Sequence, residues 1–297
     1  MNQPVDSVDG LIRLRLDLAY DGTDFAGWAK QPALRTVQSE LLAALEVIFG
    51  ASPDDFGMRV AGRTDAGVHA RHQVAHIDLT PAQIKRLGRH ASHEAREAKL
   101  MGRINSILDP DVRIHGVSLA PAGFDARFSA AHRRYRYRIS DGLSVKDPVD
   151  FRYVLWTRKP LNIDAMQLAA SKLRGLHDFA SFCKPRPFST TIRELREVTV
   201  TRNQHINKLV EIELEADAFC HNMVRAIVGA LIAVGEGRAT PEEISVLLAK
   251  RNRVGSFKVV APHGLTLIEI GYVADEEMAA QAARTKDMRT LEDDSQK

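Results

Sequence analysis

Several features that would narrow the class of protein are scarce in this sequence of 297 residues. Its two cysteines, Cys183 and Cys220, lie far apart without a C-x-x-C pattern, which argues against a disulfide framework or a structural zinc site. No apolar run approaches the roughly 20 residues that span a bilayer. Residues 1–10 carry acids and lack the apolar core of a secretory signal. We therefore expect a cytoplasmic protein without membrane segments.

An excess of one charge is also missing, since 41 Lys and Arg face 38 Asp and Glu for a net charge of +3. That balance does not by itself indicate a nucleic-acid binder. The distribution is more informative, because Arg133, Arg134, Arg136 and Arg138 crowd one segment. Such a stripe is typical of phosphate-binding surfaces, although a solvated strand face has the same pattern.

Hydrophobic periodicity in residues 1–120 predicts the order β-α-β-β-α-β. Thr36 is a suitable N-cap for a helix that ends at Gly50. The Asp65 segment then falls between two adjacent strands. The expected elements are strands 11–20, 56–61, 73–79 and 112–119, a helix 37–49, and a helical stretch 81–108 that loops out near residues 90–99.

The same order recurs in residues 131–274, followed by a polar tail, 275–297, that we expect to be flexible. The expected elements are strands 133–140, 192–201, 208–219 and 265–273, and helices 164–174, 221–234 and 241–251. The economical architecture is an α+β fold of two tandem ferredoxin-like halves, 1–120 and 131–274. We expect mixed, mostly antiparallel sheets with helices on one face and a central cleft between the halves.

The run from Ala61 to Ala70 places one carboxylate, Asp65, between Gly62 and Gly67. Both glycines allow tight backbone turns and a close approach by another molecule. A phosphate-cradling loop is excluded, because Val-His stands where Lys-Ser or Lys-Thr is needed. A surface turn in which Asp65 bonds its own backbone remains the alternative.

Two further segments combine residue types suited to RNA. In the strand from Arg133 to Ser140, Tyr135 and Tyr137 share a face and could stack on a base, or could equally be core residues. The arginines of the opposite face could meet phosphates or carboxylates. Arg225 lies at the edge of an apolar helix, where a solvated role is the default, and Leu265 reads as a buried strand residue.

Histidines at positions 69, 72 and 76 suggest a metal site by their spacing. If a strand begins at Gln73, however, they share no helix face, and no carboxylate cluster accompanies them. We therefore expect no metal and no cofactor.

Three motifs together resemble the tRNA pseudouridine synthase A family, namely 61–70, 126–137 and 223–229. The resemblance implies that Asp65 is the catalytic aspartate and that Arg225 pairs with it across the two halves. It further implies that Arg63 helps to flip and replace the base, that Tyr135 stacks on it, and that Leu265 lines the pocket.

The family resemblance also implies an activity and partners. It implies that uridines at nucleotides 38, 39 and 40 in the anticodon arm of tRNA become pseudouridine, through a covalent or a glycal route, in a homodimer. The segment 87–101 looks longer and more charged than in the family. A noncatalytic RNA-binding module and a metal-dependent hydrolase using Asp65 and the histidines are the alternatives.

Overall fold

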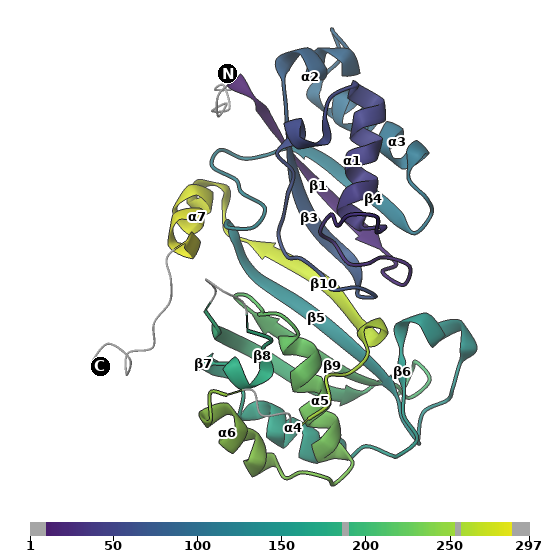
Figure 1. Ribbon diagram of the computed structural model, residues 1–297, viewed down its shortest axis with the longest axis vertical. Helices are drawn as coiled ribbons and strands as arrows, with labels where there is room; N and C mark the ends of the chain where they lie inside the picture. The colour runs from purple at the N-terminus through teal and green to yellow at the C-terminus, as the bar shows by residue number, and fades with distance from the viewer. Residues whose placement is uncertain (1–9, 186–189, 253–256, 287–297) are drawn as a thin grey trace. The chain divides into compact units, whose positions relative to one another are not determined.

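The structure is a computed structural model that describes residues 10–185, 190–252 and 257–286 (Figure 1). It has a mixed α/β fold with mostly antiparallel strands. The chain divides into two compact units. Of the described residues, the first unit holds 10–131 and 269–286, and the second holds 132–185, 190–252 and 257–268. Among the described residues, no helix is long and apolar enough to cross a membrane.

The first unit contains three long antiparallel strands in the order β4-β1-β3, with the short β2 beside β3. In the register, Leu16 of β1 lies opposite Ala75 of β3 on one side and Val117 of β4 on the other. Helix α3 packs against β4 and α1. The elements are β1 (Ile12–Tyr20), α1 (Val37–Phe49), η2 (Pro53–Phe56), β2 (Arg59–Val60), β3 (His69–Leu79), α2 (Pro81–Leu87), α3 (His93–Ile107) and β4 (Val112–Leu119).

Local signals place the ends of α1 where the sequence predicts them. The Thr36 side chain accepts a hydrogen bond from the backbone N–H of Ser39, which satisfies one of the free donors at the helix start. Gly50 ends the helix in the left-handed region at φ 63°. The apolar face between these caps is buried.

Three predicted elements of the first unit are wrong in their bounds. The strand expected over 56–61 shrinks to β2, because the segment from Pro53 to Phe56 forms a 3-10 turn. Strand β3 begins at His69, four residues before the predicted start. The segment expected to loop out is largely helical, since Ser92 caps α3 by accepting from Ala95 N–H.

The second unit has the strand order β5-β9-β8-β7, with β6 parallel to β5 and with the part of β10 up to Ile268 on the other side of β5. Leu214 of β9 lies opposite Tyr135 of β5 and Val198 of β8. The elements are β5 (Ala130–Ser140), η3 (Pro148–Tyr153), β6 (Leu155–Trp156), α4 (Ile163–Ser171), β7 (Gly175–Asp178), η4 (Ala180–Phe182), β8 (Ile192–Arg202), β9 (Val210–Ala216), α5 (Met223–Gly235), α6 (Pro241–Ala249), η5 (Pro262–Gly264) and β10 (Leu265–Tyr272).

Strand β7 and the helical segment after β10 were not among the predicted elements. Strand β7 adds an edge to β8, with Leu176 opposite Glu194. Beyond β10, a 3-10 turn η6 (Asp275–Glu277) leads into helix α7 (Met278–Lys286). Met278 is buried, so this segment makes an apolar contact that its polar composition does not predict.

The cysteines correct another expectation. Cys183 and Cys220 form a disulfide, with their Cα atoms 5.7 Å apart and a sequence separation of 37. Beside this bond, the backbone N–H of Lys184 donates to the carbonyl of His221 over 2.9 Å. Spacing along the chain says little about distance in the fold, and this is why the sequence argued against a pair.

The basic stripe of β5 is held by carboxylates. Along the strand, three arginines lie directly opposite three glutamates of β9 and form ion pairs with them. We call this set the arginine ladder: Arg134 with Glu215, Arg136 with Glu213, and Arg138 with Glu211. Arg133 is buried and donates to the carbonyl of Asp217 over 2.7 Å. The sequence allowed these arginines to meet phosphates or carboxylates, and in the structure they meet carboxylates.

Candidate active site

The loop that carries Asp65 connects β2 to β3 in the first unit, and we call residues 61–68 the Asp65 loop. Backbone hydrogen bonds tie it to its surroundings at both ends. Ala61 N–H donates to Val74 C=O over 2.9 Å, and Gly67 N–H donates to Phe25 C=O over 3.2 Å. In its middle, the carbonyl of Thr64 accepts from Trp28 N–H over 3.1 Å. The loop is therefore part of the packed structure.

Glycines allow this close packing, although not the pair that the sequence indicated. Gly67 has φ 74°, in the region that favours glycine, whereas a Cβ on Gly62 would meet open space. The close packing also requires glycine at two positions in residues 21–28. A Cβ on Gly27 would lie 2.9 Å from the Thr64 carbonyl oxygen, and one on Gly22 would overlap the carbonyl of Val68. These two positions were missed, since sequence alone does not show which loops touch.

Side chains alternate along the Asp65 loop. Thr64 is buried, whereas Arg63 is exposed and Asp65 is intermediate between the two. The Thr64 hydroxyl lies 2.8 Å from the phenol oxygen of Tyr20, which is itself buried. The loop thus inserts Thr64 into the fold and leaves the carboxylate of Asp65 partly accessible.

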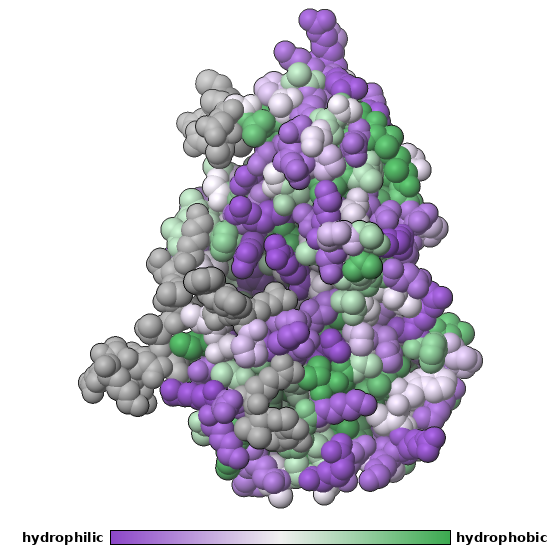
Figure 2. Space-filling model, viewed as in Figure 1, coloured by the Kyte–Doolittle hydropathy of each residue, from purple (hydrophilic) through white to green (hydrophobic). Residues whose placement is uncertain are grey.

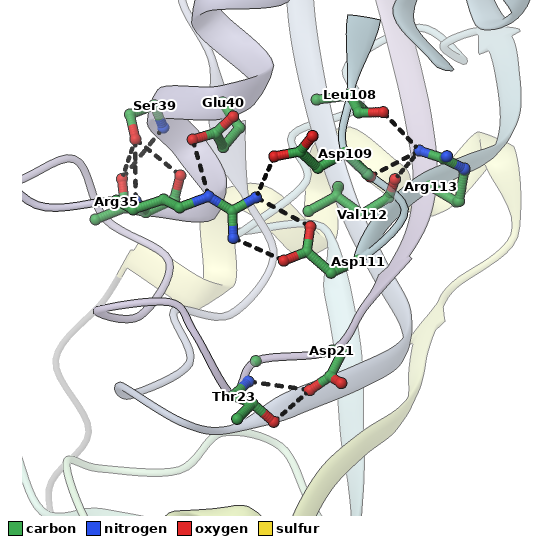
Figure 3. Close-up of polar contacts among 12 residues, drawn as sticks. Asp21, Thr23, Arg35, Ser39, Glu40, Leu108, Asp109, Asp111, Val112 and Arg113 are labelled. Carbon is green, nitrogen blue, oxygen red and sulfur yellow. Dashed lines mark hydrogen bonds and ion pairs between the residues drawn. The ribbon is translucent and has the colours of Figure 1, made fainter. Parts of the chain in front are cut away.

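Arg35 braces its own segment through ion pairs with the acidic residues that precede β4, as Figure 3 shows. Its guanidinium binds Asp111 over 2.6 Å and Asp109 over 3.2 Å, and it lies 4.2 Å from the centre of the Phe25 ring. The hydrogen bond with Asp111 raises the pKa of Arg35, so the cation persists at any physiological pH. The carbonyl of Phe25 accepts the hydrogen bond from Gly67 N–H, so Phe25 connects Arg35 to the Asp65 loop.

The three histidines of the metal hypothesis are engaged separately. The Nδ1 atom of His69 accepts from Gly22 N–H over 3.0 Å, and His72 Nε2 lies 2.9 Å from Asp17. His76 is buried and its Nδ1 accepts from Ala126 N–H over 3.0 Å. Burial lowers the pKa of His76 to about 4. Among the described residues, no group of three or more ligand side chains could hold a metal ion.

A group of arginines lies near the Asp65 loop in the first unit: Arg59, Arg63 and Arg127, the Arg127 cluster. Arg59 and Arg127 lie over the ring of Phe128, at 5.6 and 5.1 Å from its centre. Burial lowers the pKa of Arg127, and the charges of Arg63 and Arg59 lower it further. Asp125, which binds Arg59 over 2.7 Å, opposes them. Arg127 belongs to the second family motif, but nothing in that motif indicated its nearness to Arg63.

The remaining predicted residues lie in the second unit. Tyr135 is 8% exposed, and its ring meets the edge of Phe219 with centres 5.2 Å apart. Tyr137 is fully buried and donates to the carbonyl of Ala261 over 2.7 Å. Both tyrosines are thus buried, and Tyr137 is the more deeply buried of the two.

Arg225 is held in place within its own unit. Its Nε donates to the carbonyl of Val260 over 2.8 Å, and its own carbonyl accepts from Val260 N–H over 3.3 Å. Asn222, at φ 67°, precedes α5 and lies 3.4 Å from Nη1 of Arg225. A solvated helix arginine would not be tied in this way. Leu265, 5% exposed, opens β10.

Comparison with known proteins gives the wider assignment. Residues 169–273 match the family model for tRNA pseudouridine synthase. Over 95% of its length the chain is 49% identical to tRNA pseudouridine synthase A of Leifsonia xyli, covering 99% of that protein. It is 47% identical to the same enzyme of Streptomyces avermitilis, with 95% of each chain covered.

Among solved structures, a Cbf5-Nop10-Gar1 complex matches with 12% identity and a TM-score of 0.32, over 87% of this chain and 59% of that one. That similarity is too low to support any argument here. The curated relatives, by contrast, place the chain among the pseudouridine synthases. It belongs to the tRNA pseudouridine synthase A family, as the three motifs predicted.

Proposed function

We propose that the protein converts uridine to pseudouridine in tRNA, at nucleotides 38, 39 and 40 of the anticodon arm, with Asp65 as the catalytic group. The observation that carries this proposal is the 49% identity to a named tRNA pseudouridine synthase A across 95% of the chain. The structure adds that Asp65 stands partly exposed on a loop bonded at both ends. A positioned carboxylate is what the chemistry requires.

The reaction breaks the bond from N1 to C1' of the ribose, turns the uracil while it stays bound, and joins C5 to C1'. Electrons and phosphates are neither gained nor lost, so the reaction calls for no cofactor. An ionised Asp65 suffices, either by attacking C1' or by removing a ribose proton to form a glycal.

The other predicted residues have roles that follow from the same chemistry. In this proposal Tyr135 stacks on the everted uracil, Leu265 lines the pocket, and Arg63 takes the place of the displaced base. Arg225 keeps Asp65 ionised, since a carboxylate withdrawn from water gains a proton unless a cation stabilises its charge. The bonds that hold Arg225 to Val260 support such a fixed position.

We also propose that each unit is a ferredoxin-like half and that the active site is the cleft between them. The strand orders β4-β1-β3, with β2 beside β3, and β10-β5-β9-β8 support this, since both follow the order 4-1-3-2 of that fold. The expected domain limits are 1–120 and 131–274, with α7 added by the tail.

A homodimer in the cytoplasm, where tRNA is modified, completes the proposal. Its support in the structure is a pair of exposed apolar side chains in the segment after β5, where Val149 and Phe151 are 82% and 62% exposed. Figure 2 shows that hydrophobic residues lie among hydrophilic ones on the visible face of the molecule. Exposed apolar patches mark interaction sites. Light scattering that finds only monomers at micromolar concentration would contradict this part.

The decisive experiment follows release of tritium from C5-labelled uridine in unmodified tRNA, with EDTA present. We expect release by the wild type, and none by Asp65→Ala or Asp65→Asn, while both variants still bind tRNA. Removing the nucleophile or base should cost at least about a thousandfold in rate.

Each other outcome points to an alternative. Binding of tRNA without any release by the wild type would favour a noncatalytic RNA-binding module. Release that EDTA abolishes would favour metal-dependent chemistry. Full release by Asp65→Asn would remove Asp65 from the catalytic role and leave the family assignment intact.

A further inference from the structure

One buried amide group connects the Asp65 loop to the sheet beneath it. Gln73 of β3 has no exposed surface. Its Nε2 donates to the carbonyl of Gly62 over 2.7 Å and to the phenol oxygen of Tyr20 over 3.2 Å, and its Oε1 accepts from Val74 N–H over 3.2 Å. The side chain amide therefore uses both donor hydrogens and its acceptor.

The hydrogen bonds continue from Gln73 through Tyr20 to Thr64, the residue before Asp65. Because the Tyr20 oxygen accepts from Gln73, its own hydrogen is free to point to the Thr64 hydroxyl, 2.8 Å away. Burial raises the pKa of Tyr20 to about 12, so the phenol keeps this hydrogen throughout the neutral range. A single amide thus orients a chain of donors that ends on Thr64.

Gln73 thus reaches the loop by two arms, the direct bond to Gly62 and the path through Tyr20 to Thr64. These two arms meet the loop on either side of Arg63. One arm holds the carbonyl of Gly62 and the other holds the side chain of Thr64, which immediately precedes Asp65. Fixing two points separated by one residue defines both the position and the direction of a backbone segment. Further ties of the loop are backbone bonds to Phe25, Trp28 and Val74.

We propose that Gln73 is a positioning residue for the catalytic loop, acting through Gly62 and Tyr20 to aim Asp65. This inference rests on the proposed function of Asp65. Gln73 does not touch the reacting atoms. Its effect is on the rate at saturating substrate, because a carboxylate displaced by about 1 Å loses roughly a hundredfold in rate.

Three variants test the inference in the full chain, by single-turnover rates and tRNA affinity. Gln73→Leu removes both arms, and we expect a rate about 10 to 100 times lower, with tRNA affinity within about twofold of the wild type. Tyr20→Phe removes only the arm to Thr64, and should lose about three- to tenfold. The nearly isosteric Phe variant also covers the case in which the leucine variant fails to fold.

Gln73→Glu supplies a signature that general destabilisation would not produce. A protonated glutamic acid can still donate to the Gly62 carbonyl, whereas an ionised one repels that oxygen. The ratio of variant to wild-type rate should therefore rise as pH falls from 8 towards 6. A constant ratio across this range would contradict the inference.

Asn105→Leu is the matched control. The Asn105 amide also bonds to backbone, to Ile114 N–H and C=O over 2.9 and 2.8 Å, but it joins α3 to β4. We expect it to lower the midpoint of thermal unfolding while keeping the wild-type rate. If it slows turnover as much as Gln73→Leu does, then loss of any side-chain amide that bonds to the backbone is sufficient and the positioning role is wrong.

The failure of this inference differs from the failure of the proposed function. If Asp65→Asn is inactive while Gln73→Leu and Tyr20→Phe both turn over at the wild-type rate, only the positioning role is overturned. If Asp65→Asn is fully active, the catalytic assignment falls first, whatever the Gln73 variants do.

Discussion

The arginine ladder of the second unit and the Arg127 cluster of the first unit use the same side chain in opposite ways. In the ladder each arginine has one glutamate directly across the strand, so the charges cancel locally. In the cluster, burial and then the charges of Arg63 and Arg59 lower the pKa of Arg127, with Asp125 opposing. Arginines that raise one another's positive surroundings are therefore found where the sequence shows no basic run.

Arg63→Gln should give the largest effect within this comparison. Arg63 is exposed and lies two residues from Asp65, where the proposed mechanism needs a group to replace the everted base. Eversion costs a few kcal/mol, so we expect single-turnover rates to fall by about a hundredfold. The tRNA dissociation constant, measured by filter binding, should rise by less than about fivefold.

Arg63→Lys separates charge from shape. Lysine keeps the positive charge but not the planar guanidinium that can stack in place of a base. A lysine variant as active as the wild type would show that Arg63 acts only as a cation. Arg63 would then contribute its charge alone, as we expect of Arg127.

Local structure could be predicted from the sequence, whereas contacts between distant segments could not. Thr36 and Gly50 mark the ends of α1 correctly because caps act within one turn. The Asp65 motif was equally visible. Its supports were not: Gln73 reads as an ordinary strand residue until the fold places its amide beside Gly62.

The same reason explains why the sequence left the role of the basic stripe open. Arg134, Arg136 and Arg138 are neighbours in sequence, but their glutamate partners lie more than 70 residues later. The sequence displays the alternating glutamates of β9 plainly, yet only the register of the two strands shows that each faces an arginine. Charge patterns are thus interpretable only once strand pairing is known.

Arg127→Gln should have an intermediate effect, confined to binding. If the Arg127 cluster contacts the tRNA backbone, removal of one phosphate contact weakens affinity about five- to tenfold at low salt. It should also reduce the slope of log Kd against log salt by about 0.7 to 0.9. Turnover at saturating tRNA should stay within about twofold. An unchanged salt slope would show that Arg127 touches no phosphate.

Arg136→Gln should have the smallest effect and serves as the counterpart of Arg127→Gln. Both replace an arginine by the same neutral amide, but Arg136 lies opposite Glu213 with 2.6 Å between the nearest charged atoms. We expect tRNA affinity and its salt slope to match the wild type. The free energy of unfolding should fall by about 0.5 to 1 kcal/mol, typical of a partly exposed cross-strand pair.

The matching change at Glu213 sharpens this last comparison. In the double variant Arg136→Gln with Glu213→Gln, both charges of the pair are gone, so part of the lost stability should return. Denaturant unfolding of the two single variants and the double variant measures the coupling directly. If Arg136→Gln instead weakens tRNA binding as much as Arg127→Gln, the ladder takes part in RNA recognition despite its glutamates, and local charge cancellation does not separate the two groups.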